Sequence, residues 1–412
     1  MNKKQVLVIG TVWPEPGSSA AGTRMVQLLQ LFVDHGYAIT FASAAAEGPY
    51  SHPLAAMGIQ MRPIKLNDAA FNELLQQLQP QIVVYDRFMI EEQYGWRVRM
   101  ECPDALTILD TEDLHSLRAA RKLSLKSGTI VLDFSTDIAK REVAAIYRCD
   151  LSLLISEQEI EILTNQLQVN RKILYYLPFM EQVPDEAAIA DWPDMESREG
   201  FCFIGNYLHE PNWHTLQRLK TQIWPLLRKE LPGVHLHIYG AYATEKVMQL
   251  HQPKERFLVH GRAADAREAI SKHRLLLAPI AFGAGVKGKL IDAMQTGTPS
   301  VTSSIGAESM RGSLPWNGAI EDDVVRFVAS AKELYLDQGK WSQAQQHGLH
   351  ILRERYDATQ IALPFMQHVE QLCSRMETHR NQNYVGQLLH HHTANSTKYM
   401  SLWIEEKNKP HG

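Results

Sequence analysis

One stretch of the sequence decides the fold: Ala278-Pro-Ile-Ala-Phe-Gly-Ala-Gly-Val-Lys-Gly-Lys-Leu-Ile-Asp-Ala-Met-Gln-Thr-Gly-Thr-Pro299. It follows the apolar run Leu275-Leu-Leu277, which has the composition of a buried strand. Three glycines come next, Gly283, Gly285 and Gly288, and glycine lets the backbone approach a ligand closely. A helix that ends before Gly297 then presents one apolar face, formed by Leu290, Ile291 and Met294. The stretch therefore predicts a strand, a glycine-rich turn and a helix in succession.

The start of this predicted helix has the features of an anion site. A helix N-terminus offers free backbone N–H groups and the positive end of the helix dipole. Lys287 and Lys289 add two positive charges there, so a diphosphate would suit the site. Asp292 follows one turn later and could accept hydrogen bonds from ribose hydroxyls. The alternative interpretation is a tight turn with two solvated lysines and an ordinary helix aspartate.

Strands and helices alternate along both halves of the chain. The predicted strands cover residues 6–9, 38–42, 81–85, 106–109 and 151–155, and then 201–204, 234–239, 257–259, 275–277 and 300–302. Such alternation predicts parallel, doubly wound sheets. An irregular, proline-containing acidic stretch predicts a linker at about 180–199. We therefore expect an α/β fold of two Rossmann-like domains facing a central cleft, with domains at 1–180 and 200–375 and a helical tail, 376–412, that crosses back to the N-terminal domain.

Composition narrows the class of protein. The chain has 412 residues, which suits two domains, and a formal net charge of -4, which argues against a general nucleic-acid binder. Its four cysteines are far apart and show no C-x-x-C spacing, so neither a zinc site nor a disulfide framework is indicated. No apolar stretch approaches the roughly 20 residues that span a bilayer. We expect a cytoplasmic protein, with peripheral contact to the inner face of the membrane left open.

The N-terminal half offers further candidate site residues after its predicted strands. The loop Gly17-Ser-Ser-Ala-Ala-Gly22 precedes Thr23 and Arg24, and it lacks the G-x-G-x-x-G pattern of nicotinamide-binding enzymes. Asp86 and Arg87 follow one strand, and a polar run follows another: Asp110, Asp113, His115 and Arg118. His115 could hydrogen-bond a sugar hydroxyl, whereas Arg118 could equally form a structural salt bridge with Asp113 or Glu112.

The fold-deciding stretch also resembles the donor-site signature of retaining GT-B glycosyltransferases, the glycosyl transferases group 1 or family 4. Many members have a Gly-x-Gly-x-Lys-x-Lys turn, a Glu-Ala-Met helix and a Gly-x-Pro, and the resemblance extends over 301–308 and 203–212. It implies a GT-B fold, a nucleotide-sugar donor and a carbohydrate or lipid-linked acceptor, with no cofactor. The implied donor-binding residues are Gly205, Asn206, Gly283, Gly285, Val286, Lys287, Lys289 and Asp292. The implied acceptor and loop residues are Gly22, Thr23, Arg24, Asp86 and Asp110. The implied catalytic residues are His115, Lys289 and Asp292.

Two departures from the family pattern bear on this interpretation. The usual Glu-x7-Glu pair would fall at 284 and 292, where this chain has Ala284 and Asp292. Asp292 keeps a carboxylate, but Ala284 removes the acid that lies near the donor sugar in relatives. No Asp-x-Asp metal motif is present, so we expect transfer without a metal. The alternatives are a nucleotide-sugar epimerase and a non-catalytic nucleotide- or sugar-binding scaffold of the same fold.

The end of the chain contains an apolar cluster within a polar tail: Tyr399, Met400, Leu402, Trp403 and Ile404. Burial of a tryptophan alone contributes roughly 2–3 kcal/mol, so an exposed cluster would be unfavourable. We therefore expect this cluster to be buried against the N-terminal domain.

Overall fold

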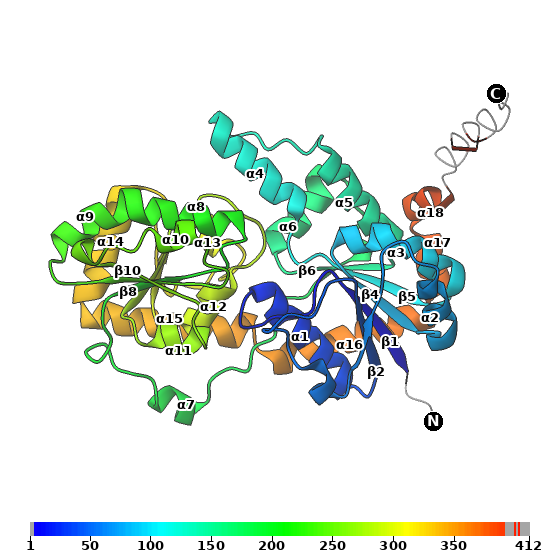
Figure 1. Ribbon diagram of the computed structural model, residues 1–412, viewed down its shortest axis with the longest axis horizontal. Helices are drawn as coiled ribbons and strands as arrows, with labels where there is room; N and C mark the ends of the chain where they lie inside the picture. Colours follow the sequence, from blue (N-terminus) through cyan, green and yellow to red (C-terminus); the bar gives the residue numbers. More distant parts are fainter. Residues whose placement is uncertain (1–3, 392–398, 401–402, 404–412) are drawn as a thin grey trace.

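The computed structural model describes residues 4–391, 399–400 and 403, and it contains two parallel sheets (Figure 1). The seven-stranded sheet contains, in spatial order, β3 (Gln60–Pro63), β2 (Ala38–Ser43), β1 (Gln5–Gly10), β4 (Ile82–Asp86), β5 (Leu106–Asp110), β6 (Leu151–Leu154) and β7 (Leu174–Tyr176). The six-stranded sheet contains β10 (Phe257–Gly261), β9 (Leu236–Tyr239), β8 (Phe201–Ile204), β11 (Leu275–Ala278), β12 (Ser300–Thr302) and β13 (Gly318–Ile320). The expected pair of doubly wound α/β domains is confirmed.

Helices cover both faces of each sheet. Those of the N-terminal half are α1 (Ala20–Asp34), α2 (Ala70–Leu78), α3 (Phe88–Glu101), α4 (His115–Ser127), α5 (Asp137–Arg148) and α6 (Glu157–Glu161). The linker contains α7 (Glu186–Ala190). The C-terminal half contains α8 (Glu210–Arg218), α9 (Trp224–Glu230), α10 (Glu245–Met248), α11 (Ala266–Ser271), α12 (Gly288–Gln295), α13 (Ser304–Ala307), α14 (Val324–Leu336) and α15 (Gln338–Arg355). The chain continues with α16 (Ala358–Ser374), α17 (Met376–Asn381) and α18 (Tyr384–His391).

Both sheets reverse their strand order at a point that faces the other domain. The order reverses between β1 and β4 in the first sheet and between β8 and β11 in the second. Loops at such a reversal diverge to opposite faces of the sheet and leave a crevice at the carboxyl ends of the strands. The two crevices therefore form the natural walls of one ligand site.

Three strands of the structure were not predicted from the sequence, and one helix begins earlier than predicted. β3, β7 and β13 contain only three or four residues each, too few for a clear hydrophobic pattern. The loop after β1 was expected to reach Gly22, but α1 begins at Ala20. Its N-cap is Ser19, whose hydroxyl accepts the N–H of Gly22 at 3.1 Å.

The chain returns to the N-terminal domain earlier than the sequence suggested. The linker and the returning segment run side by side, because Glu181 N–H donates to the Tyr356 carbonyl at 2.7 Å and Ala358 N–H donates to the Glu181 carbonyl at 2.9 Å. Immediately after this point α16 packs Phe365 and Val369 into the N-terminal apolar core. The crossing therefore occurs at residues 357–358, ahead of the expected boundary at 376.

The expected burial of the tail cluster is wrong for its three described residues. Tyr399, Met400 and Trp403 expose 66%, 57% and 59% of their surface, whereas Leu402 and Ile404 lie outside the described residues. The physical reason is that α16 already supplies the apolar face that the sequence assigned to this cluster.

Within the described part of the chain, no helix is both long and apolar enough to cross a membrane.

Candidate functional site

A cavity of about 540 Å³ lies between the two domains. The N-terminal domain contributes the loop after β1, the start of α1, and residues that follow β4 and β5. The C-terminal domain contributes the loop after β8 and the turn before α12. A volume of this size suits a ligand of several hundred daltons.

The glycine turn brings the two domains into close contact. Gly285 has a φ of +62°, and a Cβ on it would lie 2.9 Å from the Cβ of Asp113. A Cβ on Gly288 would lie 2.6 Å from the Cβ of Ala20, the first residue of α1. The N-terminal ends of α1 and α12 therefore meet at the cavity, and both helix dipoles direct positive potential into it.

Lys287 and Lys289 line the cavity without a carboxylate partner among the described residues. The ammonium of Lys287 donates to the carbonyls of Ala284 and Gly285, the former at 3.0 Å. The ammonium of Lys289 donates to Asn212 Oδ1 at 2.6 Å and lies 4.3 Å from the centre of the Phe203 ring. Burial lowers the pKa of Lys287 to about 8 and that of Lys289 to about 7, the second with help from the nearby charge of Lys287. Two desolvated amines that form no ion pair with a described carboxylate favour an incoming anion.

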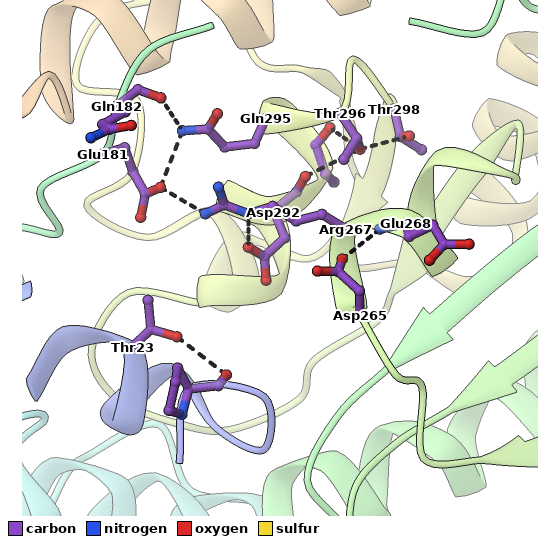
Figure 2. Close-up of polar contacts among 12 residues, drawn as sticks. Thr23, Glu181, Gln182, Asp265, Arg267, Glu268, Asp292, Gln295, Thr296 and Thr298 are labelled. Atoms are coloured by element: carbon purple, nitrogen blue, oxygen red, sulfur yellow. Dashed lines mark hydrogen bonds and ion pairs between the residues drawn. The ribbon is translucent and has the colours of Figure 1, made fainter. Parts of the chain in front are cut away.

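Asp292 is held by an ion-pair network that reaches the linker (Figure 2). Arg267 Nε donates to Asp292 Oδ1 at 2.9 Å, and Arg267 Nη2 donates to Glu181 Oε2 at 2.7 Å. Gln295 also donates to this Glu181 oxygen, at 3.1 Å. The network fixes the Asp292 carboxylate at the cavity wall, where the predicted ribose contact would form.

Four of the N-terminal candidates do not line the cavity. Arg24 and Asp110 form a fully buried ion pair at 2.8 Å, and Arg24 also donates to the Leu177 carbonyl at 2.8 Å. Asp86 accepts the N–H of Thr11 at 2.9 Å. Gly22 packs so closely that a Cβ there would lie 2.4 Å from the Glu15 carbonyl. All four residues therefore make structural contacts. The sequence could not predict these contacts because the partners are distant in the chain or depend on the shape of a turn.

The other candidates converge on the cavity. Thr23 lines it, and its hydroxyl donates to the Pro16 carbonyl at 3.4 Å (Figure 2). The remaining lining candidates are His115, Gly205, Asn206, Gly283, Val286, Lys287, Lys289 and Asp292. Gly285 contributes through its backbone: its N–H points to Glu159 of the other domain.

His115 is the first residue of α4 and faces the cavity. Its backbone N–H donates to Glu142 Oε1 at 2.8 Å, so a carboxylate of α5 caps the helix. Its ring lies 3.7 Å from Asp113, which is paired with Arg118, as one of the sequence alternatives proposed. Burial lowers the pKa of His115 to about 4, so the imidazole is neutral at pH 7.

Arg87 and Glu112 are two further polar residues that the structure brings to the cavity wall. Both line the cavity, and both have a left-handed backbone, with φ of +70° and +63°. Such strain in residues other than glycine is concentrated at functional sites. Glu112 is buried, its Oε1 has no hydrogen-bond partner among the described residues, and burial raises its pKa to about 8. The only sequence signal was the position of each residue just after a strand.

Two sets of hydrogen bonds join the domains on either side of the cavity. Arg121 of α4 donates to the Gly283 carbonyl at 2.8 Å and to the Glu308 carboxylate at 2.9 Å. Tyr242 donates to Glu15 at 2.6 Å on the other side. These pairs join residues far apart in sequence, so no local motif could have predicted them.

Comparisons with known proteins agree with this architecture. Residues 198–337 match the family described as Glycosyl transferases group 1. No curated protein matches the chain at a significant level. The pneumococcal O-GlcNAc transferase GtfA, solved with UDP and GlcNAc, superposes with a TM-score of 0.67 at 12% identity, over 90% of this chain and 99% of that chain.

Two further solved structures are similar over their full length. HepE from Anabaena, solved with UDP and glucose, has a TM-score of 0.66 at 12% identity, over 90% of this chain and 100% of that chain. Sucrose-phosphate synthase from Thermosynechococcus elongatus has a TM-score of 0.66 at 14% identity, with the same coverage. At these identities the likeness establishes a shared fold. Residues 198–337 thus match the glycosyl transferases group 1 family, and the chain as a whole has the two-domain GT-B fold of these solved structures.

Proposed function

We propose that the cavity binds a nucleoside-diphosphate sugar and that the sugar is transferred to an acceptor hydroxyl with retention at the anomeric carbon. The observation that carries the proposal is the pair Lys287 and Lys289, two cations without carboxylate partners at the start of α12. The solved relatives GtfA and HepE hold UDP, which makes UDP-sugars the first donors to test. Retention is the stereochemistry of the family that the donor turn resembles.

The proposed chemistry depends on charge at the leaving group. As the glycosidic bond lengthens, negative charge grows on the diphosphate oxygens. Lys287, Lys289 and the free N–H groups at the start of α12 would stabilise that charge, which lowers the barrier to bond cleavage. Because these groups can neutralise a diphosphate unaided, we propose that no metal is required. Asp292, oriented by Arg267, would bind the ribose.

The opposite wall would receive the acceptor. Arg87, Glu112 and His115 line it. Burial raises the pKa of Glu112 to about 8 and lowers that of His115 to about 4, so both groups are mainly uncharged at neutral pH. Uncharged groups can hydrogen-bond sugar hydroxyls without placing negative charge beside the diphosphate. The proposed acceptor class is a glycan, a lipid-linked sugar or a small hydroxyl compound.

Calorimetric titration with UDP and with uridine tests the donor site. Lys289→Ala is expected to weaken UDP binding at least tenfold and to leave uridine binding nearly unchanged, because only the diphosphate contacts the ammonium. Lys246→Ala is the matched control, since this lysine lies outside the cavity and over the Trp213 ring. Equal losses for UDP and uridine would overturn the assignment.

A further inference from the structure

Four carboxyl groups of the described residues line the cavity, and one of them has no partner. Three are held in ion pairs with arginines: Asp113, Glu181 and Asp292. The fourth, Glu112, is 7% exposed, and its carboxyl group forms no hydrogen bond or ion pair with a described residue. Burial of an unpartnered carboxyl is unfavourable, and such groups are rare away from functional sites. Glu112 is therefore placed to contact a bound substrate.

The backbone on both sides holds Glu112 in a fixed, strained position beside the donor turn. Its φ of +63° is left-handed. The hydroxyl of Thr111 donates to the Leu153 carbonyl at 2.8 Å, and the N–H of Leu114 donates to a Glu159 oxygen at 3.0 Å. A Cβ on Gly285 would lie 3.5 Å from the Glu112 carbonyl oxygen, so this loop packs directly against the turn before α12. Strain of this kind persists only where the surroundings enforce it.

The surroundings of Glu112 suit a group that gains and loses a proton near neutral pH. Burial is the largest cause that raises its pKa, to about 8. Four charged groups of the N-terminal domain also act on it: Asp110, Arg87, Arg24 and Asp86. The two aspartates raise the pKa of Glu112 and the two arginines lower it, so their effects oppose one another. Asp113, the next residue, is paired with Arg118, and Lys287 of the donor turn also faces the cavity.

The other titratable groups of the cavity wall are poorer proton acceptors. Burial lowers the pKa of His115 and of His209 to about 4, so each imidazole is a weak base. Lys287 and Lys289 carry their protons when they bind a diphosphate, and the three paired carboxylates are already bonded to arginines. A base works best when its pKa is close to the working pH, which leaves Glu112 as the suitable group among the described lining residues.

We propose that the carboxylate of Glu112 is the base that takes the proton from the attacking hydroxyl of the acceptor, an inference that rests on the proposed sugar transfer. The acceptor oxygen bonds to the anomeric carbon while the bond from that carbon to the diphosphate oxygen breaks. The diphosphate leaves with the electron pair, and the proton stays on Glu112 until it passes to solvent. Because Glu112 borders the donor turn, the hydroxyl is activated on the side from which the diphosphate leaves, as retention requires.

Hydrolysis of UDP-glucose and of UDP-N-acetylglucosamine by the full-length protein tests the proposal. Water is the acceptor in this assay, because water must lose a proton just as a sugar hydroxyl does. At saturating donor, kcat of the parent protein should rise about tenfold or more from pH 6 to pH 8 as Glu112 loses its proton. Glu112→Gln should lower kcat about 100-fold or more and remove this rise, while UDP affinity stays within about twofold of the parent value. Glu161→Gln, exposed on α6 and outside the cavity, is the matched control.

Chemical rescue adds a readout that a purely structural role would not change. Glu112→Ala leaves room for a small carboxylate, so sodium formate should raise its rate about tenfold or more in proportion to the formate concentration. Formate should not accelerate the parent protein, whose own carboxylate occupies this position.

The contrary outcomes separate this inference from the proposed function. A Glu112→Gln protein with the kcat and pH profile of the parent, or a slow Glu112→Ala protein that formate does not accelerate, would overturn the base role and leave the sugar transfer intact. A parent protein that binds UDP but hydrolyses neither donor would count against the transfer itself and would overturn the base role with it. Calorimetric UDP binding by each variant shows that the cavity is correctly folded.

Discussion

Glu159 of α6 accepts a hydrogen bond from the backbone N–H of Gly285 at 2.8 Å, although the two residues belong to different domains. The same carboxyl oxygen accepts the N–H of Leu114, next to His115, at 3.0 Å. One buried side chain thus links the donor turn to the start of α4. Burial raises the pKa of Glu159 to about 8, so this group is mainly protonated at neutral pH.

Replacement of Glu159 should show whether this link matters. Glu159→Ala leaves two buried N–H groups unpaired and should lower the free energy of unfolding by about 2–4 kcal/mol, with a raised donor KM. Glu159→Gln keeps the accepting oxygen and resembles a protonated carboxyl, so it should stay close to the parent protein. Glu161→Ala, exposed on the same helix, is the control. Denaturant unfolding and donor kinetics decide the question, and an alanine variant that matches the parent in both would contradict the account.

Donor binding should weaken as the pH rises. The pKa values of Lys289 and Lys287, about 7 and about 8, mean that Lys289 is half deprotonated at pH 7 and that both amines are largely neutral by pH 9 in the empty cavity. A bound diphosphate favours the charged amines, so UDP-glucose affinity should fall at least tenfold over this range and binding at pH 8 should take up protons. UDP-glucose is chosen because its diphosphate does not titrate here.

Lys289→Arg provides the control for this pH dependence, because arginine keeps its charge throughout. Its affinity profile should be flatter than that of the parent protein. Calorimetry in buffers with different ionisation enthalpies measures the proton uptake directly. A parent profile that is flat from pH 7 to pH 9, without proton uptake, would be incompatible with desolvated amines at the diphosphate.

The buried pair Arg24 and Asp110 should act on stability. Arg24→Met leaves the Asp110 carboxylate buried and unpaired, which costs about 3–5 kcal/mol of unfolding free energy. Arg24→Met/Asp110→Leu removes both charges and should recover most of that loss. An Arg24→Met protein with unchanged stability but impaired ligand binding would contradict this structural role and would indicate that Arg24 contacts the ligand.

Turnover should be independent of divalent cations, since Lys287, Lys289 and the start of α12 supply the positive charge that the leaving diphosphate requires. Initial rates in EDTA should equal those in Mg²⁺ or Mn²⁺. A large loss in EDTA that either ion restores would refute this prediction.

The sequence predicted local features well and long-range ones poorly. The glycine turn, Lys287, Lys289 and the helix after them were readable because strand, turn and helix signals are adjacent in the chain. The assignment of Arg24 and Asp110 to the acceptor site ignored their mutual burial, which depends on residues 86 positions apart. Glu142 and Glu159 went unnoticed for the same reason, because each accepts a hydrogen bond from a residue that only the fold brings near.

Ala284 illustrates what the structure adds to a motif. The sequence showed only that an acid is missing there. In the structure this side chain is 7% exposed and packs with the apolar core of the N-terminal domain. The position therefore lies where the two domains meet, between this apolar cluster and the cavity that Ala284 also lines.

The most direct test of the account is turnover of nucleotide sugars by the purified protein, followed by release of the nucleoside diphosphate and by NMR of the product. The account predicts that a UDP-sugar is consumed, that the transferred or hydrolysed sugar keeps its anomeric configuration, and that Lys289→Ala abolishes most of this activity. Binding without turnover would indicate a scaffold, and an epimerised sugar would indicate an epimerase. Either result, or inversion at the anomeric carbon, would contradict the proposed retaining transfer.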